Sequence, residues 1–260
     1  MCNLQAGIDT PPFRCPVINI DDPIGLFNGR SSVTALFIFT TSRLTEREYA
    51  MEIKNSVVLV TGASSGIGEA TARAVVQAGA RAVLLARRQD RLDDLASELG
   101  NDVLALPCDV TNPVEVKKAV QIAQERYGRI DVLINNAGQG LYASIEDIAI
   151  EDFRGLLNLN TVAPLIMMQA VIPLMRKQGA GCIVNVSSGA TLATYPSVAA
   201  YTSSKSALNM ISKVARLELA DAGITVSLIH PFMTATEFYG SVKSGLSTAQ
   251  EQEVGATSIA

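Results

Sequence analysis

From Met51 onward, short runs of apolar residues alternate with segments that carry the spacing of helices. None of these runs alternates with polar residues, as a strand with one solvent-exposed face would. Strands that are apolar on both sides are typical of a parallel sheet covered by helices. Because strand–helix–strand crossovers are right-handed, the pattern predicts an α/β fold with a doubly wound, mainly parallel sheet of the Rossmann type. The expected strands are 57–60, 82–85, 103–106, 132–134, 182–186 and 225–229. The first expected helix follows the first strand and ends near residue 77. The other expected helices cover about 90–99, 114–128, 152–177 and 199–220.

The composition of this 260-residue chain narrows the classes of function. Apolar residues make up 48% and charged residues 18%, a balance that argues against disorder. The net charge of −4 offers no basic excess to neutralise a phosphate backbone, so we expect no nucleic-acid partner. One histidine and four cysteines without a Cys-x-x-Cys pair cannot form a Cys/His metal cage or a dense disulfide framework. We therefore expect no metal and a reducing compartment, the cytoplasm.

Residues 1–50 differ in character from the rest of the chain. They hold several prolines and no sustained strand or helix period. We expect them to be a poorly ordered extension, and residues 51–260 to form a single domain. Two alternatives stay open for the extension: translation that begins at Met51, and an arm that binds a partner.

No segment has the character of a membrane span or a secretory signal. The longest apolar stretch, 163–175, includes Gln169 and two prolines, and it is shorter than the roughly 20 residues that cross a bilayer. The apolar segment 33–39 lacks the basic region and the cleavage site of a signal peptide. A peripheral apolar anchor at 33–39 stays open.

A glycine-rich segment, Thr61–Glu69, directly follows the first expected strand and opens a helix. Glycines there allow a tight turn and let backbone N–H groups approach a pyrophosphate, which the positive end of the helix also attracts. The spacing is G-x-x-x-G-x-G, and the Gly-Lys-Ser/Thr ending of an NTPase loop is absent. The segment therefore favours dinucleotide binding over ATP hydrolysis, with a purely structural turn as the alternative.

The end of the second expected strand indicates which dinucleotide is bound. An NAD site carries an acidic residue there, which accepts hydrogen bonds from the ribose 2′-hydroxyl. This chain has Ala86 followed by Arg87 and Arg88, and a guanidinium can bind a 2′-phosphate in forked geometry. We infer NADP(H) as the cofactor, with a solvated helix start as the alternative explanation of the two arginines.

Tyr201 and Lys205 lie four residues apart on an expected helix and therefore share one face. A free tyrosine, with a pKa of about 10, is a poor acid–base group at neutral pH. A nearby ammonium favours the phenolate and lowers that pKa. Ser187 and Ser188 end the fifth expected strand, at the sheet edge where open α/β folds bind ligands.

Several motifs now stand in one order and spacing: Thr61–Gly68, Asn135-Asn136-Ala137-Gly138, Ser188 and Tyr201-x-x-x-Lys205. Over about residues 53–238, the chain resembles the short-chain dehydrogenase/reductase family. The resemblance implies hydride transfer between a nicotinamide and a carbonyl or secondary alcohol, without a metal. It also implies a homodimer or homotetramer, formed through the helices at 152–177 and 199–220.

The resemblance assigns roles to four candidate catalytic residues. Ser188 would hydrogen-bond the substrate oxygen, with its neighbour Ser187 turned toward the sheet. Tyr201 would be the general acid or base, and Lys205 would lower its pKa and bind the nicotinamide ribose. Asn160 would support a proton relay through water, with local backbone satisfaction as its alternative role.

The resemblance also implies a set of cofactor contacts. Asp109 would contact the adenine or, alternatively, cap the next helix. Phe232 stands where the family has glycine, so the turn that leads to the carboxamide contact departs from the family. His230 is expected to be a strand-end residue and not a proton donor. The full set is Gly62, Ser64, Ser65, Gly66, Ile67, Gly68, Arg87, Arg88, Asp109, Val110, Asn136, Gly138, Tyr201, Lys205, Thr234 and Thr236.

The chain departs from the family after Gly240, because the 20 residues that follow contain no run typical of a strand. We therefore expect six core strands without the family's seventh, and lower stability than a relative with a longer tail. Apolar candidate pocket residues favour a hydrophobic small molecule as substrate. Two alternatives to a reductase are a catalytically idle dinucleotide-binding sensor or scaffold, and a dehydratase or epimerase on the same fold. The candidate pocket residues are Gln139, Leu141, Tyr142, Thr191, Leu192, Tyr195, Met233 and Phe238.

Overall fold

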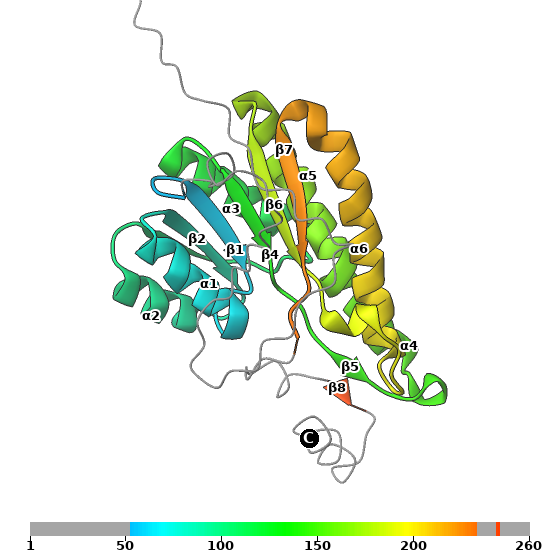
Figure 1. The fold of residues 1–260 in the computed structure, drawn as a ribbon. Helices are drawn as coiled ribbons and strands as arrows, with labels where there is room; N and C mark the ends of the chain where they lie inside the picture. Colours follow the sequence, from blue (N-terminus) through cyan, green and yellow to red (C-terminus); the bar gives the residue numbers. More distant parts are fainter. Residues whose placement is uncertain (1–52, 233–242, 245–260) are drawn as a thin grey trace, which may run out of the picture.

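The computed structural model describes residues 53–232 and 243–244. Its centre is a six-stranded sheet in which every pairing is parallel, with the order β3-β2-β1-β4-β6-β7 (Figure 1). The order runs outward from β1 in both directions, so the predicted doubly wound α/β sheet is confirmed. The strands are β1 (Val57–Thr61), β2 (Arg81–Ala86), β3 (Val103–Pro107), β4 (Val132–Asn135), β6 (Gly181–Val186) and β7 (Ile224–Ile229).

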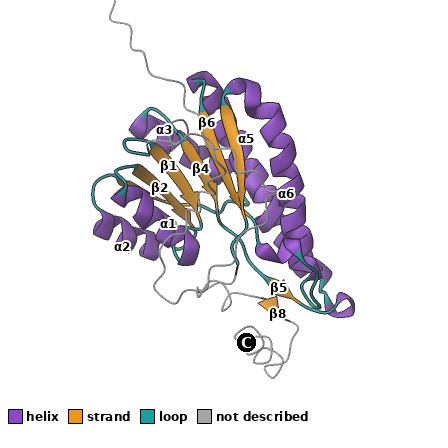
Figure 2. Ribbon diagram, in the orientation of Figure 1, coloured by secondary structure: helices purple, strands orange, loops and turns teal. Residues whose placement is uncertain are grey.

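Helices cover both faces of this sheet (Figure 2). Alternate residues of β1 illustrate the division: Val58 and Val60 pack with α1 and α2, whereas Val57 and Leu59 pack with α3 and α5. Every residue of β1 is buried, which explains the unbroken apolar run in the sequence. The helices are α1 (Gly66–Gln77), α2 (Gln89–Leu99), α3 (Pro113–Tyr127), α4 (Ile150–Leu157), α5 (Ala163–Gln178) and α6 (Ala199–Leu219), with short 3-10 turns at Ile145–Asp147, Gly189–Leu192 and Ala220–Ala222.

The helix predicted over 152–177 is correctly located but is not a regular α-helix. A π-helical segment, Asn158–Val162, joins α4 to α5 in one continuous helical stretch. A π segment interrupts the ordinary hydrogen-bond spacing and is frequent at functional sites. The sequence analysis did not separate the two helices, because apolar residues continue at helical spacing on both sides of this single irregular turn.

By length and composition, the continuous stretch Ile150–Gln178 could cross a membrane. In the structure its middle packs on the sheet, with Met167, Val171 and Met175 fully buried in the core. This packing is that of a core helix, in agreement with the sequence prediction.

A two-residue pair of strands, β5 (Leu141–Tyr142) and β8 (Lys243–Ser244), lies outside the main sheet. The sequence did not predict either strand, and two residues are too few to carry a period. The remainder of the segment where a seventh strand was expected to be missing, 233–242 and 245–260, lies outside the described residues. So do residues 1–50, and the two-part division of the chain stays a prediction.

Candidate active site

The glycine-rich turn joins β1 to α1 at the carboxyl edge of the sheet. Gly62 and Gly66 have φ values of +66° and +57°, a left-handed conformation that side chains disfavour. Ser65 is the N-cap residue of α1 but does not cap it with its side chain. The first N–H groups of α1 therefore face the turn without a hydroxyl cap from Ser65, as in helix ends that bind anions.

Gly68 is required because the chain packs against itself at this point. A Cβ atom there would lie 2.2 Å from the Gly62 carbonyl oxygen and 2.6 Å from Nδ2 of Asn136. Asn136 in turn donates from Nδ2 to the Thr61 carbonyl oxygen at 3.0 Å and from its backbone N–H to Oγ1 of Thr61 at 2.9 Å. The predicted cofactor residue Asn136 thus ties the end of β4 to the turn.

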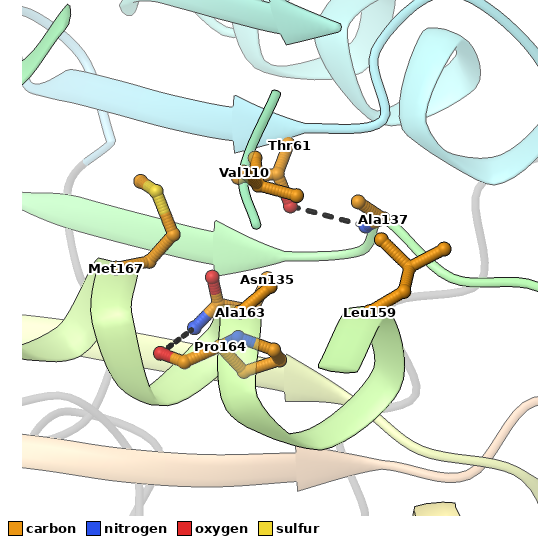
Figure 3. Close-up of a pocket in the computed structure, with 8 residues that line it drawn as sticks. All are labelled: Thr61, Val110, Asn135, Ala137, Leu159, Ala163, Pro164 and Met167. Carbon is orange, nitrogen blue, oxygen red and sulfur yellow. Dashed lines mark hydrogen bonds between the residues drawn. The ribbon is translucent and has the colours of Figure 1, made fainter. Parts of the chain in front are cut away.

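The turn rests on a tightly packed layer between the strand ends and the helical stretch that packs against them (Figure 3). Oγ1 of Thr61 accepts from the Ala137 N–H at 3.0 Å, and Nδ2 of Asn135 donates to the Pro164 carbonyl oxygen at 3.4 Å. The space between these groups is too narrow to admit a water molecule. These packed residues support the turn, and the space between them is not a ligand site. Its lining is Thr61, Val110, Asn135, Ala137, Leu159, Ala163, Pro164 and Met167.

Arg88 extends from the end of β2 over the glycine-rich turn. Its Nη2 donates to Oγ of Ser64 at 3.0 Å and to Oγ of Ser65 at 2.9 Å, and its Nε approaches the Ser64 hydroxyl at 3.2 Å. The two serines and the arginine were all predicted to contact the cofactor, and the serine hydroxyls hold the Arg88 guanidinium beside the start of α1. These bonds span more than twenty residues of sequence, so spacing alone could not reveal them.

Asp109 follows β3, and its side chain accepts from the N–H and Oγ1 of Thr111 at 2.9 and 2.7 Å. Burial alone would raise the pKa of this carboxyl, but the two Thr111 hydrogen bonds and the positive charge of Arg87 bring it below its ordinary value. Asn112, not Asp109, caps α3 by accepting from the Val114 N–H. The alternative role of Asp109 as a helix cap is therefore wrong. Its neighbour Val110 is buried.

Tyr201 and Lys205 lie in the first two turns of α6, and both are buried. Nζ of Lys205 donates to the Val186 carbonyl oxygen at 2.8 Å, which fixes α6 to the end of β6. Burial lowers the pKa of Lys205 to about 8. The ammonium therefore lies in a desolvated place near the carboxyl edge of the sheet.

Asn160 lies in the π segment and is fully buried. Its Oδ1 accepts from the Gln139 N–H at 2.9 Å, while Nδ2 donates to the Gln139 carbonyl oxygen at 2.9 Å and to Oγ of Ser204 at 3.0 Å. The side chain therefore joins the loop after β4 to α6. The alternative role, in which the side chain bonds backbone groups, is observed as well. The backbone groups belong to Gln139, 21 residues earlier in the chain, and not to the helix of Asn160 itself.

Gly138 lies where these elements meet. A Cβ atom there would lie 3.1 Å from Oδ1 of Asn160 and 3.3 Å from Nζ of Lys205. Three residues that were predicted from separate motifs are therefore brought together in space.

Ser188 follows β6 and caps the short helix Gly189–Leu192, with its Oγ accepting from the Ala190 N–H at 3.1 Å. Ser187 is buried, and its hydroxyl has no hydrogen-bond partner among the described residues.

Sequence reasoning missed the groups that hold the end of β6. Asn135 and Asn185 are paired across β4 and β6, and Nδ2 of Asn185 donates to Oγ of Ser212 on α6 at 2.7 Å. His230, directly after β7, places Nδ1 3.1 Å from the Ser188 carbonyl oxygen. The position of two asparagines inside apolar strands was a signal for the Asn135–Asn185 pair. No pattern in the sequence marked the bond between His230 and Ser188.

The loop after β7 is only partly described. The Phe232 ring lies against Gly189, where a Cβ atom would be 2.8 Å from it, and its side chain is otherwise exposed. The predicted cofactor residues Thr234 and Thr236, and the candidate pocket residues Met233 and Phe238, lie outside the described residues. Within the described part of the chain, no group of three His, Cys, Asp or Glu side chains is arranged to hold a metal ion.

The residues fit a bound dinucleotide. The turn after β1 brings backbone close to the start of α1, and any side chain at Gly62 or Gly68 would fill that approach. At the far end of the same edge, Gly138 keeps the space beside Asn160 and Lys205 free of a side chain. A long ligand could therefore lie along the carboxyl ends of β1, β4 and β6.

Comparisons with known proteins identify the family. Residues 56–246 match the short chain dehydrogenase family. An uncharacterized oxidoreductase of Staphylococcus aureus strain N315 is 36% identical over 185 residues, which are 71% of this chain and 80% of the relative. The uncharacterized oxidoreductase YxjF of Bacillus subtilis strain 168 is 37% identical over 198 residues, 75% of this chain and 77% of its own length.

Solved structures give the same result. A 3-ketoacyl-(acyl-carrier-protein) reductase from Brucella melitensis complexed with NADH has a TM-score of 0.71 and 29% identity, and the match covers 73% of this chain and 81% of that one. A short-chain dehydrogenase from Streptomyces avermitilis has a TM-score of 0.71 and 34% identity, with 78% and 76% covered. A short chain dehydrogenase/reductase from Burkholderia phymatum, in complex with NAD, has a TM-score of 0.71 and 27% identity, with 74% and 70% covered.

Proposed function

Because this chain belongs to the short-chain dehydrogenase/reductase family, we propose that it is an NADP(H)-dependent oxidoreductase that interconverts a carbonyl and a secondary alcohol on a hydrophobic small molecule. The observation that carries the proposal is the convergence of Asn160, Lys205 and Gly138 beside the end of β6, where Ser188 begins the next turn. When bound, the nicotinamide supplies or accepts the hydride.

The proposed acid–base group is the Tyr201 phenol. Lys205 lies one helical turn further on the same face of α6, and burial lowers the pKa of its ammonium to about 8, so it is charged at neutral pH. A cation with little surrounding water stabilises a nearby phenolate more strongly than a solvated one does. One Nζ proton is used by the Val186 carbonyl oxygen, so two remain for other partners such as a ribose hydroxyl.

The proposed preference for NADP(H) rests on Arg88 and Arg87. Arg88 is held over the glycine-rich turn by the hydroxyls of Ser64 and Ser65, close to where the adenine end of a dinucleotide would lie. The positive charge of a guanidinium held at this place favours a phosphate over a hydroxyl on the adenosine ribose. Two of the structural relatives hold NADH or NAD, so this preference is a property proposed for the present chain.

We also propose that two copies associate through α6. Met210, Val214 and Leu217 share one face of this helix and are all exposed. A groove of about 420 Å³ runs between α5 and α6 beside Met210 and Val214. Light scattering of the wild type and of Met210→Glu tests this association. The wild type should have the mass of a dimer or a larger oligomer, and the variant should have a lower mass, because association would bury an unpaired charge.

The test of the proposed reaction is a panel of ketones, aldehydes and secondary alcohols, each assayed with NADPH and NADH. Tyr201→Phe should lower turnover by about 10²- to 10⁴-fold, as expected for loss of a general acid or base. Tyr127→Phe is the matched control, because Tyr127 is the last residue of α3, which leads to the amino end of β4 and lies away from the proposed machinery. Cofactor binding without any turnover would instead support the idle binding module, and unchanged turnover in Tyr201→Phe would remove that residue from the mechanism.

Cofactor preference is tested with Arg87→Asp and Arg88→Ser. Both should shift the ratio of kcat/KM for NADPH over NADH toward NADH, by about 10-fold or more for loss of one charged hydrogen-bonding group. Arg91→Ser, on the exposed part of α2, is the matched loss of positive charge. An unaltered ratio in both test variants would contradict the 2′-phosphate argument.

A further inference from the structure

The chain after β7 runs alongside the turn that contains Ser188. The Ser187 N–H donates to the Ile229 carbonyl oxygen at 2.8 Å, and the Gly189 N–H donates to the Pro231 carbonyl oxygen at 2.9 Å. The β6–β7 pairing therefore continues past the last strand residues. His230 lies between these two acceptors, half-buried, with Nδ1 3.1 Å from the Ser188 carbonyl oxygen.

The hydrogen-bond pattern places a proton on Nδ1 of His230. A carbonyl oxygen only accepts, so the bond to Ser188 needs an Nδ1–H donor. The second neighbour, Oγ1 of Thr191 at 3.3 Å, already donates its own proton to the Ser188 carbonyl oxygen at 2.8 Å. Oγ1 of Thr191 is therefore an acceptor toward the imidazole. It accepts from Nδ2 of Asn209 as well, at 3.2 Å.

These bonds leave the Ser188 peptide firmly held. Its carbonyl oxygen accepts from the Thr191 N–H at 3.1 Å, from the Thr191 hydroxyl and from His230. Its side-chain oxygen accepts from the Ala190 N–H at 3.1 Å. With the acceptor role of Oγ used in this way, the hydroxyl proton of Ser188 remains available to donate to a substrate oxygen.

We propose that His230 is a positioning residue for Ser188, which acts through its Nδ1–H bond to the Ser188 carbonyl oxygen and does not touch the substrate. This inference rests on the proposed function, in which the Ser188 hydroxyl polarises the substrate oxygen. The bond uses the same N–H in the neutral and the cationic imidazole, so the role does not require a change of protonation. Small errors in the placement of a reacting group cost up to about 100-fold in rate.

Substitutions separate positioning from packing. His230→Ala should lower kcat by about 10- to 100-fold and leave the Kd for NADPH unchanged. His230→Asn carries its amide nitrogen at the position of Nδ1 and should recover most of the activity. His230→Gln carries its amide nitrogen one bond further out, at the position of Nε2, and should recover little. The Asn and Gln variants also serve if the Ala variant does not fold.

A double-mutant cycle identifies the target of His230. In a Ser188→Ala background, His230→Ala should cause no further loss of kcat, because the group that it positions is gone. An equal further loss in that background would show that His230 acts elsewhere and would overturn the proposal. So would wild-type kcat in His230→Ala, or equal activity of the Asn and Gln variants.

A measurement without turnover checks the geometry. The chain has one histidine, so its imidazole ¹⁵N and ¹³C resonances can be assigned without ambiguity. At alkaline pH the neutral ring should be the Nδ1–H tautomer, with Nε2 unprotonated. An Nε2–H tautomer would overturn the proposal. Absence of turnover in the wild type with the whole panel would overturn the proposed function and this role with it, whereas an active wild type with an equally active His230→Ala variant would overturn this inference alone.

Discussion

Two turns at the carboxyl edge of the sheet are built in different ways. The turn after β1 obtains its shape from its own backbone, with Gly62 and Gly66 in left-handed conformations and Gly68 where no side chain fits. The turn after β6 contains Ser188 and is held from outside, by Nδ1 of His230 beyond β7 and by the Lys205 bond to Val186. Distant residues contact both turns, since Asn136 also bonds Thr61. The glycines that shape the first turn are nevertheless close together in the sequence, whereas the second turn is held by single residues up to 42 positions away.

This difference explains which turn can be recognised without a structure. A backbone that must adopt positive φ leaves glycines at fixed spacing, and these are visible in the sequence. A turn braced by distant side chains leaves only single residues such as His230, which have no characteristic spacing. The difference also predicts separate failures: damage to the first turn affects stability and cofactor binding, and damage to the second affects turnover.

The largest effect should come from the second turn. Ser188→Ala should lower kcat by about 10²- to 10³-fold, the usual cost of removing one hydrogen-bond donor to a developing oxyanion. The Kd for NADPH, measured by fluorescence titration, should stay within about twofold of the wild-type value. Ser203→Ala is the control, since Ser203 is an exposed residue of α6 whose hydroxyl bonds only its own helix, at Ala200.

A Ser188→Ala variant that binds NADPH much more weakly would contradict the separation of the two turns. Equal turnover in Ser188→Ala and Ser203→Ala would remove Ser188 from the proposed reaction.

A smaller effect is expected from the first turn. Gly68→Ala places a methyl group 2.2 Å from the Gly62 carbonyl oxygen, so the backbone must move. Overpacking of this kind lowers the free energy of unfolding by about 1–3 kcal/mol, and binding of NADPH should weaken with it. Urea denaturation and cofactor titration measure the two effects.

Gly155→Ala is the matched control for that substitution. Gly155 lies in α4 with nothing within 4 Å of a built Cβ, so alanine should be neutral or stabilise by up to about 1 kcal/mol. If both variants were equally stable and bound NADPH equally well, the close approach at Gly68 would have no energetic role.

The sequence was sufficient for much of this fold because its signals are local. The strand β1 is buried on both faces, so its apolar run indicated a strand of a covered parallel sheet, and the doubly wound arrangement followed from the handedness of crossovers. The π segment with Asn160 was missed because one irregular turn shifts the phase of an apolar pattern without ending it. The bonds of Arg88 to the serines, and of His230 to Ser188, join distant segments, and only the folded chain brings those residues together.

The smallest effect, measured per pH unit, concerns the desolvated ammonium that joins the second turn to α6. Burial lowers the pKa of Lys205 from 10.5 to about 8. Between these values the unfolded chain binds a proton that the folded chain does not, so the free energy of unfolding should rise with pH across this window. The slope from this one group is at most about 1.4 kcal/mol per pH unit.

Lys205→Met should remove that contribution, and urea denaturation at several pH values between 8 and 10.5 would measure it. Lys213→Met, on an exposed part of the same helix, should keep the wild-type slope. Parallel slopes for the wild type and Lys205→Met would contradict the burial of a titrating ammonium at this position.

The π segment Asn158–Val162 also sets the angular phase of the helical stretch in which it lies. One extra residue in a helix rotates everything that follows by about 100°. The apolar stripe of α5 that meets the sheet through Met167, Val171 and Met175 is therefore out of phase with the buried Leu156 of α4. Deleting a single residue from this segment would turn that stripe away from the sheet, so its length is constrained independently of which residues occupy it.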